Sequence, residues 1–139
     1  MKLSDIEINL KKLHSEFVIN EGANAEQIKQ AQEKLGVKLP GQVIQLYESF
    51  NGLSVVKPKL EIFEIGQLEK KDNIIKFALF NGAHPIGFDT SHINDAEQWS
   101  IINTNTGFVL TLTVASLLTN KIWAWLHRDR EIWADEKYT

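Results

Sequence analysis

The stretch Glu21–Leu53 constrains the fold of this chain most, because it predicts two short helices joined by a tight corner. Asn24 is placed to cap the first helix, and Gln27, three residues later, is placed to complete a capping box. Gly36 stands where the chain leaves this helix, at a point that favours a left-handed backbone. Nearly every position has a structural role, so the stretch predicts a scaffold rather than a reaction.

The corner itself depends on the pair Leu39-Pro40. Proline excludes the preceding residue from the helical region and is tolerated at the start of a helix, so Pro40 separates the two helices and opens the second. The second helix then has an apolar stripe and a stop signal, formed by Val43, Tyr47, Phe50 and the glycine of Asn51-Gly52.

The chain has 139 residues, which predicts one domain over residues 1–139 with a single hydrophobic core. Its formal charge of −3 gives no electrostatic case for direct binding to nucleic acid or to an anionic membrane. The absence of cysteine excludes disulfides and thiolate chemistry. The charged N-terminal sequence lacks the apolar core of a signal peptide, and no apolar run is long enough to span a membrane, so we expect a cytoplasmic protein.

The remaining pattern predicts an α+β fold with N-terminal helices, a central, mainly antiparallel sheet and a closing C-terminal helix. Leu3–Phe17 has the apolar spacing of a helix, with Ser4 and Glu7 as a capping box, and His14 lies beside its stripe. A mixed-charge turn is expected at Glu69–Asp72. The expected strands are Leu60–Ile65, Ile74–Phe80, Pro85–Asp89, Trp99–Asn103 and Phe108–Thr113, and the closing helix runs from Val114 to Leu126.

Catalytic and metal-binding patterns are weak. The chain has no glycine-rich phosphate loop, no nucleophile elbow and no His-Glu-x-x-His pair, so we expect no enzyme activity and no cofactor. A loop-rich region contains residues of metal-ligand type, but their spacing matches no template. These residues are His84, Asp89, His92 and Asp95. The carboxylate pairs Glu61/Glu64 and Glu131/Asp135 are interpreted as solvated surface.

Two groups of residues are candidates for binding a protein partner. In the first, Asp89, Asp95 and Glu97 occur with no lysine or arginine among them, and Trp99 at the edge could act as an aromatic anchor. The second is the C-terminal group Glu131, Trp133, Asp135 and Glu136. The alternative interpretation is that Trp99 and Trp133 are packing residues, since tryptophan is highly buried on average.

The central stretch resembles the SUKH superfamily, which takes in bacterial immunity proteins and a fungal cell-wall-synthesis regulator. The resemblance is carried by a helix ending in Leu35-Gly36, an extended link to Leu39-Pro40, and a helix that ends at Asn51-Gly52. The pattern Val114–Leu118, leading into Trp125, is also similar to the last helix of the family.

The resemblance implies a non-catalytic binding protein. Bacterial members typically neutralise a polymorphic toxin encoded beside them, which implies a cognate toxin domain, possibly a nuclease, as the partner. Fungal members act as regulatory interaction domains, so a housekeeping interaction domain remains the alternative. The matched residues imply the fold and do not identify a binding site. An acidic surface would suit a nuclease partner, because the active site of a nuclease is basic.

Overall fold

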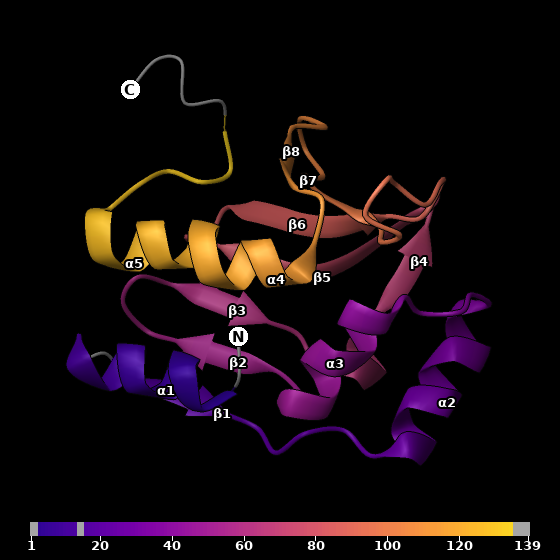
Figure 1. Ribbon diagram of the computed structural model, residues 1–139, viewed down its shortest axis with the longest axis horizontal. Helices are drawn as coiled ribbons and strands as arrows, with labels where there is room; N and C mark the ends of the chain where they lie inside the picture. The colour runs from indigo at the N-terminus through magenta and orange to yellow at the C-terminus, as the bar shows by residue number, and fades with distance from the viewer. Residues whose placement is uncertain (1–2, 14–15, 135–139) are drawn as a thin grey trace.

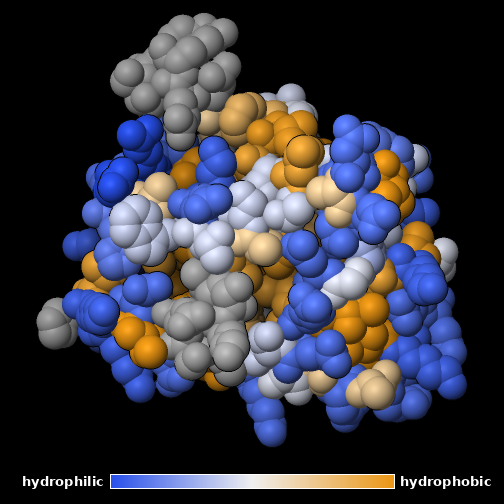
Figure 2. All heavy atoms as spheres, in the orientation of Figure 1, coloured by the Kyte–Doolittle hydropathy of each residue, from blue (hydrophilic) through white to orange (hydrophobic). Residues whose placement is uncertain are grey.

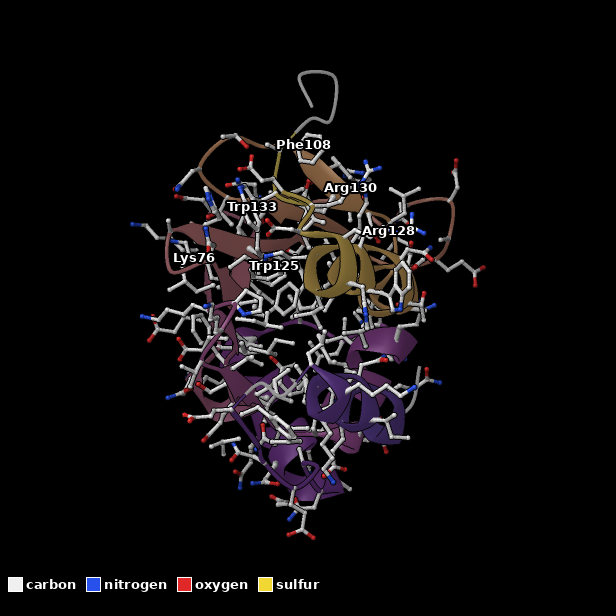
Figure 3. The ribbon with its side chains drawn as sticks, turned by 90° about the vertical axis from the view of Figure 1, so that its left-hand side faces the viewer. Lys76, Phe108, Trp125, Arg128, Arg130 and Trp133 are labelled. Carbon is white, nitrogen blue, oxygen red and sulfur yellow. The ribbon has the colours of Figure 1, made fainter. Side chains whose placement is uncertain are left out.

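The computed structural model describes residues 3–13 and 16–134, with the backbone alone for residues 3–5. It is an α+β fold in which helices lie over one face of an antiparallel sheet (Figures 1 and 3), as the sequence predicts. The helices are α1 (Leu3–Lys12), α2 (Ala25–Leu35), α3 (Gly41–Ser49), α4 (Val114–Ser116) and α5 (Trp123–Arg128), with the 3₁₀ turn η1 (Ile65–Gln67) and the π-helical segment η2 (Leu117–Ile122). The strands are β1 (Phe17–Ile19), β2 (Leu53–Val55), β3 (Leu60–Ile62), β4 (Glu69–Lys71), β5 (Ile74–Phe80), β6 (His84–Asp89), β7 (Ser100–Asn103) and β8 (Val109–Thr111).

The predicted helix–corner–helix unit is confirmed in α2 and α3. Asn24 caps α2 and forms the full capping box with Gln27. Gly36 has a φ of 68°, a left-handed conformation that costs glycine nothing. Pro40 occupies the N-cap of α3, and the side chain of Leu39 is buried. The corner is closed by a bond that the pattern did not predict, from the Leu39 N–H to the side-chain oxygen of Gln32 at 2.9 Å.

The first helix is shorter than the sequence predicts. It ends at Lys12, and Phe17 begins strand β1 instead of completing the helix. The β-branched residues that follow favour a strand, and β1 pairs antiparallel with β2, with Val18 opposite Ser54. The side chain of Ser4 and all of His14 lie outside the described residues.

The sheet follows the order β1-β2-β3-β5-β6-β7-β8, and β4 pairs separately with β5. Every pairing is antiparallel, which confirms the predicted sheet type. β7 and β8 form the hairpin expected around residues 104–107. The predicted strand at Leu60–Ile65 stops at Ile62, because the chain enters η1 at Ile65.

The mixed-charge turn predicted at Glu69–Asp72 is wrong over most of its length. Glu69–Lys71 form strand β4, with Glu69 opposite Lys76 on β5. The turn itself consists of Asp72 and Asn73, whose φ angles are 53° and 62°. Aspartate and asparagine tolerate the left-handed region better than other non-glycine residues, which is why a two-residue hairpin fits here.

The closing helix is built from α4, η2 and α5 in succession. Its N-cap is Thr113, whose side-chain oxygen accepts a hydrogen bond from Ser116 N–H at 3.0 Å. Its buried side chains face the sheet, and they are Val114, Leu117, Leu118, Ile122 and Trp125. The helix therefore covers the sheet with the face that the apolar spacing predicts.

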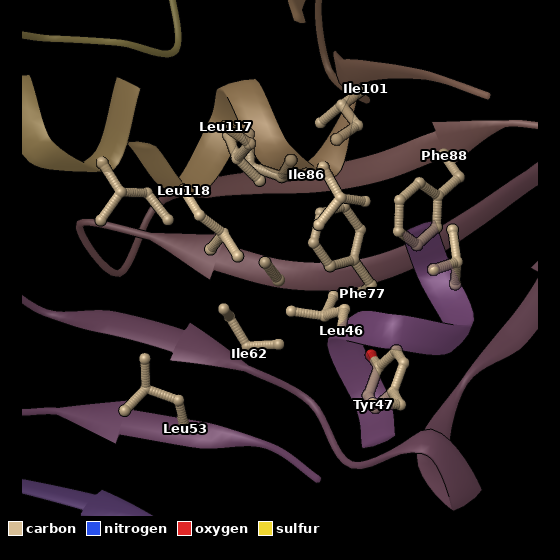
Figure 4. Close-up of a cluster of buried hydrophobic side chains, with 14 of the residues drawn as sticks. Leu46, Tyr47, Leu53, Ile62, Phe77, Ile86, Phe88, Ile101, Leu117 and Leu118 are labelled. Carbon is tan, nitrogen blue, oxygen red and sulfur yellow. The ribbon is translucent and has the colours of Figure 1, made fainter. Parts of the chain in front are cut away.

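The core lies between the sheet and the helices, and Figure 4 shows it as a layer of interlocking side chains. Phe77 and Phe88 stack with ring centroids 4.1 Å apart. Tyr47 of α3 is fully buried, and its hydroxyl donates a hydrogen bond of 3.0 Å to the carbonyl oxygen of Phe63. Burial raises the pKa of Tyr47 far above its usual value, because an ionised phenolate would lose its hydration.

The segment after α5 returns to the sheet and closes one end of the core. Trp133 meets Trp125 edge to face at 5.1 Å and stacks on the ring of His84 at 4.6 Å (Figure 3). Its carbonyl oxygen accepts a hydrogen bond from the side-chain amide of Asn103 at 3.0 Å. Trp133 therefore joins the closing helix to β6 and β7.

Candidate functional site

The loop between β6 and β7, residues 90–99, carries the first predicted group of acidic residues. Asp95 and Glu97 are exposed on it, and Asp89 lies half-buried where β6 ends. No lysine or arginine occurs between Lys76 and Lys121, so His92 is the one basic residue in the loop that carries these carboxylates. The structure therefore exposes Asp95 and Glu97 on the same loop.

The loop is organised from within by Asn94. Its side-chain oxygen accepts hydrogen bonds from the N–H groups of Ala96 and Gln98, at 2.9 and 3.3 Å. Its side-chain amide donates to Ser100 Oγ at 3.2 Å and to the Leu112 carbonyl at 2.9 Å. A single side chain thus ties the loop to itself, to β7 and to the end of β8.

Gln98 connects the loop to the helices. Its side-chain oxygen accepts from the N–H of Gln42 in the first turn of α3, at 3.2 Å. The side chain of Gln42 in turn accepts from the N–H of Ala115 in α4, at 2.9 Å. These are orphan donors at helix N-termini, and Pro40 offers α3 no side-chain cap. The loop therefore supplies part of the capping of α3.

Exposed aliphatic side chains accompany the carboxylates. Ile93 is 55% exposed and Leu112 is 48% exposed, and the bond from Asn94 to the Leu112 carbonyl brings their backbones together. Figure 2 shows hydrophobic atoms gathered at the surface near the position of β8. Val109 of β8 is 47% exposed. We define the acidic loop surface as Ile93, Asp95, Glu97 and Leu112.

The sequence did not identify these two aliphatic residues. Their exposure depends on the path of the loop, and a lone Ile or Leu in a polar segment carries no periodic signal. Trp99, the expected aromatic anchor, is only 5% exposed and packs at 5.9 Å from the ring of Phe88. Its place behind the loop is the packing role that the sequence analysis left open as the alternative.

Asp89 supports the start of the loop. Its carboxylate accepts from both the N–H and the hydroxyl of Ser91, at 3.0 and 2.6 Å. Partial burial tends to raise the pKa of Asp89, but the bonds from Ser91 and the charge of His92 together hold it below its usual value. Asp89 therefore stays ionised at neutral pH and adds to the negative charge at the base of the loop.

The second predicted group lies apart from the first. Glu131 is exposed in the segment after α5. In Figure 1 this segment starts at the left of the molecule, whereas the β6–β7 loop lies at the right. Trp133 is 7% exposed and packs against the core, and Asp135 lies outside the described residues. The structure thus does not join the two groups into one surface.

The candidate metal ligands are dispersed. His84 stacks on Trp133, whereas His92 contacts Ser91 at 3.1 Å beside Asp89. Within residues 3–13 and 16–134, no three His, Asp or Glu side chains are grouped so that they could hold a metal ion. Among the carboxylate pairs, Glu64 accepts a hydrogen bond from Asn20 and caps η1.

A hollow of about 400 Å³ occupies the sheet face that the helices leave uncovered. Its walls mix lysines and carboxylates with Phe63 and Ile74, and Figure 3 shows Lys76 on this side. Glu69 lies opposite Lys76 on neighbouring strands, so the charges in the hollow largely offset one another. The hollow consequently lacks the single-sign charge of the β6–β7 loop.

Replacing Asn94 with alanine is expected to lower the free energy of unfolding by about 1–2 kcal/mol, because four hydrogen bonds lose their partner at a partly exposed site. Urea denaturation followed by circular dichroism measures the change. Asn120→Ala is the matched control, since the side chain of Asn120 makes one hydrogen bond, of 3.3 Å, at an exposed position of the closing helix. Equal stabilities of the two variants would contradict the role given to Asn94.

The model of the SMI1 / KNR4 family (SUKH-1) matches residues 22–137. The matched region includes the helix–corner–helix unit, the β6–β7 loop and the closing helix. No curated protein matches the chain. Among the described residues, every helix is too short or too polar to cross a bilayer.

Proposed function

Because this chain belongs to the SMI1/KNR4 (SUKH-1) family, we propose that it is a non-catalytic immunity protein that binds and neutralises a cognate toxin domain. Members of this family are generally non-catalytic, and SUKH domains are protein-interaction modules. The family includes immunity proteins as well as the fungal regulator. The acidic loop surface is the observation that favours the first of these functions here.

The acidic loop surface has the physical properties that an inhibitor of a basic active site requires. Its carboxylates can take the positions of substrate phosphates, and Ile93 and Leu112 can bury apolar area beside them. The bonds of Asn94 and Gln98 hold the loop in one shape, which reduces the entropy lost on binding. A toxin with a cationic cleft, such as a nuclease, is the partner that fits this charge.

The proposal places binding in the cytoplasm of the protected cell and needs neither a cofactor nor contact with nucleic acid. Residues 1–139 would act as one binding domain. Trp99 would support the surface from within the core.

Co-expression with the product of the adjacent open reading frame tests this function. We expect protection of the host from that product and a stable complex on size-exclusion chromatography. Reversing the loop charges with Asp95→Lys and Glu97→Lys is expected to weaken the complex at least about tenfold, because close charges in an interface are strongly coupled. Isothermal titration calorimetry measures the change in Kd.

The matched control reverses two exposed carboxylates elsewhere, Glu33→Lys on α2 and Glu48→Lys on α3, and changes the net charge equally. This control is expected to bind as the wild type does. Loss of affinity in both double variants would indicate a general charge effect and contradict the assignment to the loop. Absence of both complex and protection, together with a partner unrelated to toxins, would favour the regulatory alternative.

A further inference from the structure

A second surface, on the closing helix, has the opposite chemistry. We propose that Trp123, His127 and Arg128 of α5 form a docking site for an acidic segment of a partner protein. This site is separate from the acidic loop surface and extends beyond the proposed function. We call it the α5 aromatic–cation site.

Its geometry centres on Trp123. The Trp123 side chain is 37% exposed, whereas Trp99, Trp125 and Trp133 are buried. The ring of His127 stacks on the Trp123 ring at 5.0 Å, and the guanidinium carbon of Arg128 lies 5.1 Å from the centroid of the Trp123 ring. Stacking on neighbouring side chains restricts the motion of the indole, so little entropy remains to be lost on binding.

The closing helix carries basic residues and no acidic ones. The run from Val114 to Arg128 contains Lys121, His127 and Arg128 and no acidic residue. Trp123 also lines a narrow crevice with Asn9 and Leu10 of α1, and Lys12 lies one helical turn beyond Asn9. Asp129 follows the helix, but Arg130 comes directly after it. A carboxylate-bearing partner is the occupant that complements Lys121 and Arg128.

Tryptophan and arginine together are the residues most enriched among the energetic anchors of protein interfaces. The guanidinium of Arg128 can bind a carboxylate while the indole receives an apolar side chain of the same segment. A nucleic acid fits less well, because binding of its backbone needs a longer series of cations and the protein carries a net charge of −3.

The site also lies at a distance from the acidic loop surface. In Figure 1, α5 occupies the left of the molecule and the β6–β7 loop the right. The π-helical segment η2 directly precedes Trp123, and such segments are frequent at functional sites because they redirect the following side chains. Two partners of opposite charge could therefore bind at the same time.

Selection from a random peptide library tests the proposal. Peptides that bind the wild type and fail to bind Arg128→Glu are collected and sequenced. We expect them to be enriched in Asp and Glu, each with a neighbouring apolar residue. A synthetic, tryptophan-free version of the most enriched peptide is expected to protect Trp123 from acrylamide quenching and to bind Arg128→Glu at least about tenfold more weakly.

Lys76→Glu is the matched control, because it makes the same charge change on the opposite side of the molecule (Figure 3). This variant is expected to bind the peptide as the wild type does. Recovery of no peptide that depends on Arg128, or of peptides without acidic enrichment, would overturn the proposal. So would tighter Arg128-dependent binding of a single-stranded oligonucleotide than of the peptide at equal salt.

Discussion

Trp133→Ala is expected to lower the free energy of unfolding by about 3–5 kcal/mol, the range for removing a large aromatic side chain from a core. Trp133 is 7% exposed, although it lies within a few residues of the end of the described chain. Its ring contacts Trp125 and His84, so its loss leaves a cavity between the closing helix and β6. Thermal unfolding should show a midpoint lower by about 10 °C or more.

Trp123→Ala is the control, since it makes the same substitution at a side chain that is 37% exposed. It is expected to cost less than Trp133→Ala, because a larger fraction of the Trp123 side chain is already in contact with solvent. If Trp133→Ala were as stable as Trp123→Ala, the packing of Trp133 between the closing helix and β6 would not stabilise the fold.

Tyr47→Phe is the second substitution with a large expected effect. It removes the hydroxyl that donates to the Phe63 carbonyl and leaves that acceptor without its partner, at a cost of about 1–3 kcal/mol at neutral pH. Chemical denaturation at pH 7 measures this change. Tyr47→Leu, which also removes the aromatic ring, is expected to be less stable still.

The burial of Tyr47 also predicts that the free energy of unfolding decreases at alkaline pH. The pKa of Tyr47 is raised by burial in the folded state, whereas an unfolded tyrosine has a pKa of about 10. Above about pH 10 the unfolded chain loses this proton and the folded chain keeps it. The free energy of unfolding of the wild type therefore falls by about 1.4 kcal/mol per pH unit from this group alone.

Tyr47→Phe lacks this contribution, so the gap in stability between the wild type and the variant should narrow as the pH rises above about 10. Lysine titration affects both proteins and cancels in the difference. A gap that stays constant up to pH 11 would show that the phenol is not shielded from water.

The sequence predicts the helix–corner–helix unit well because its signals are local. Asn24, Gly36 and Pro40 each act through their own backbone or through a residue three or four positions away. Strands β1 and β4 lack such signals. Phe17–Ile19 follow directly on a helical period, and pairing with β2, far along the chain, makes them a strand. The side chains of β4 are all exposed, so this strand has no alternation of apolar and polar residues to identify it.

The candidate site likewise has features that the sequence predicts and features that it does not. Charge is readable from composition, so the acidic character of the β6–β7 loop is evident in the sequence, and the structure places Asp95 and Glu97 in the solvent. Burial is not local, and both tryptophans expected beside the carboxylates pack inward. Ile93, Leu112 and Trp123 became candidates only once their exposure was known.

In the β6–β7 loop, the residues that hold the backbone in place differ from the residues that face the solvent. The hydrogen bonds that shape the loop use the side chains of Asn94 and Gln98, and none that we find in the described chain uses those of Ile93, Asp95 or Glu97. Under the proposed function, variation at these outward positions would alter which toxin the protein binds while the hydrogen bonds beneath stay intact. Binding a different toxin would then require a few substitutions in the β6–β7 loop and no change of the fold.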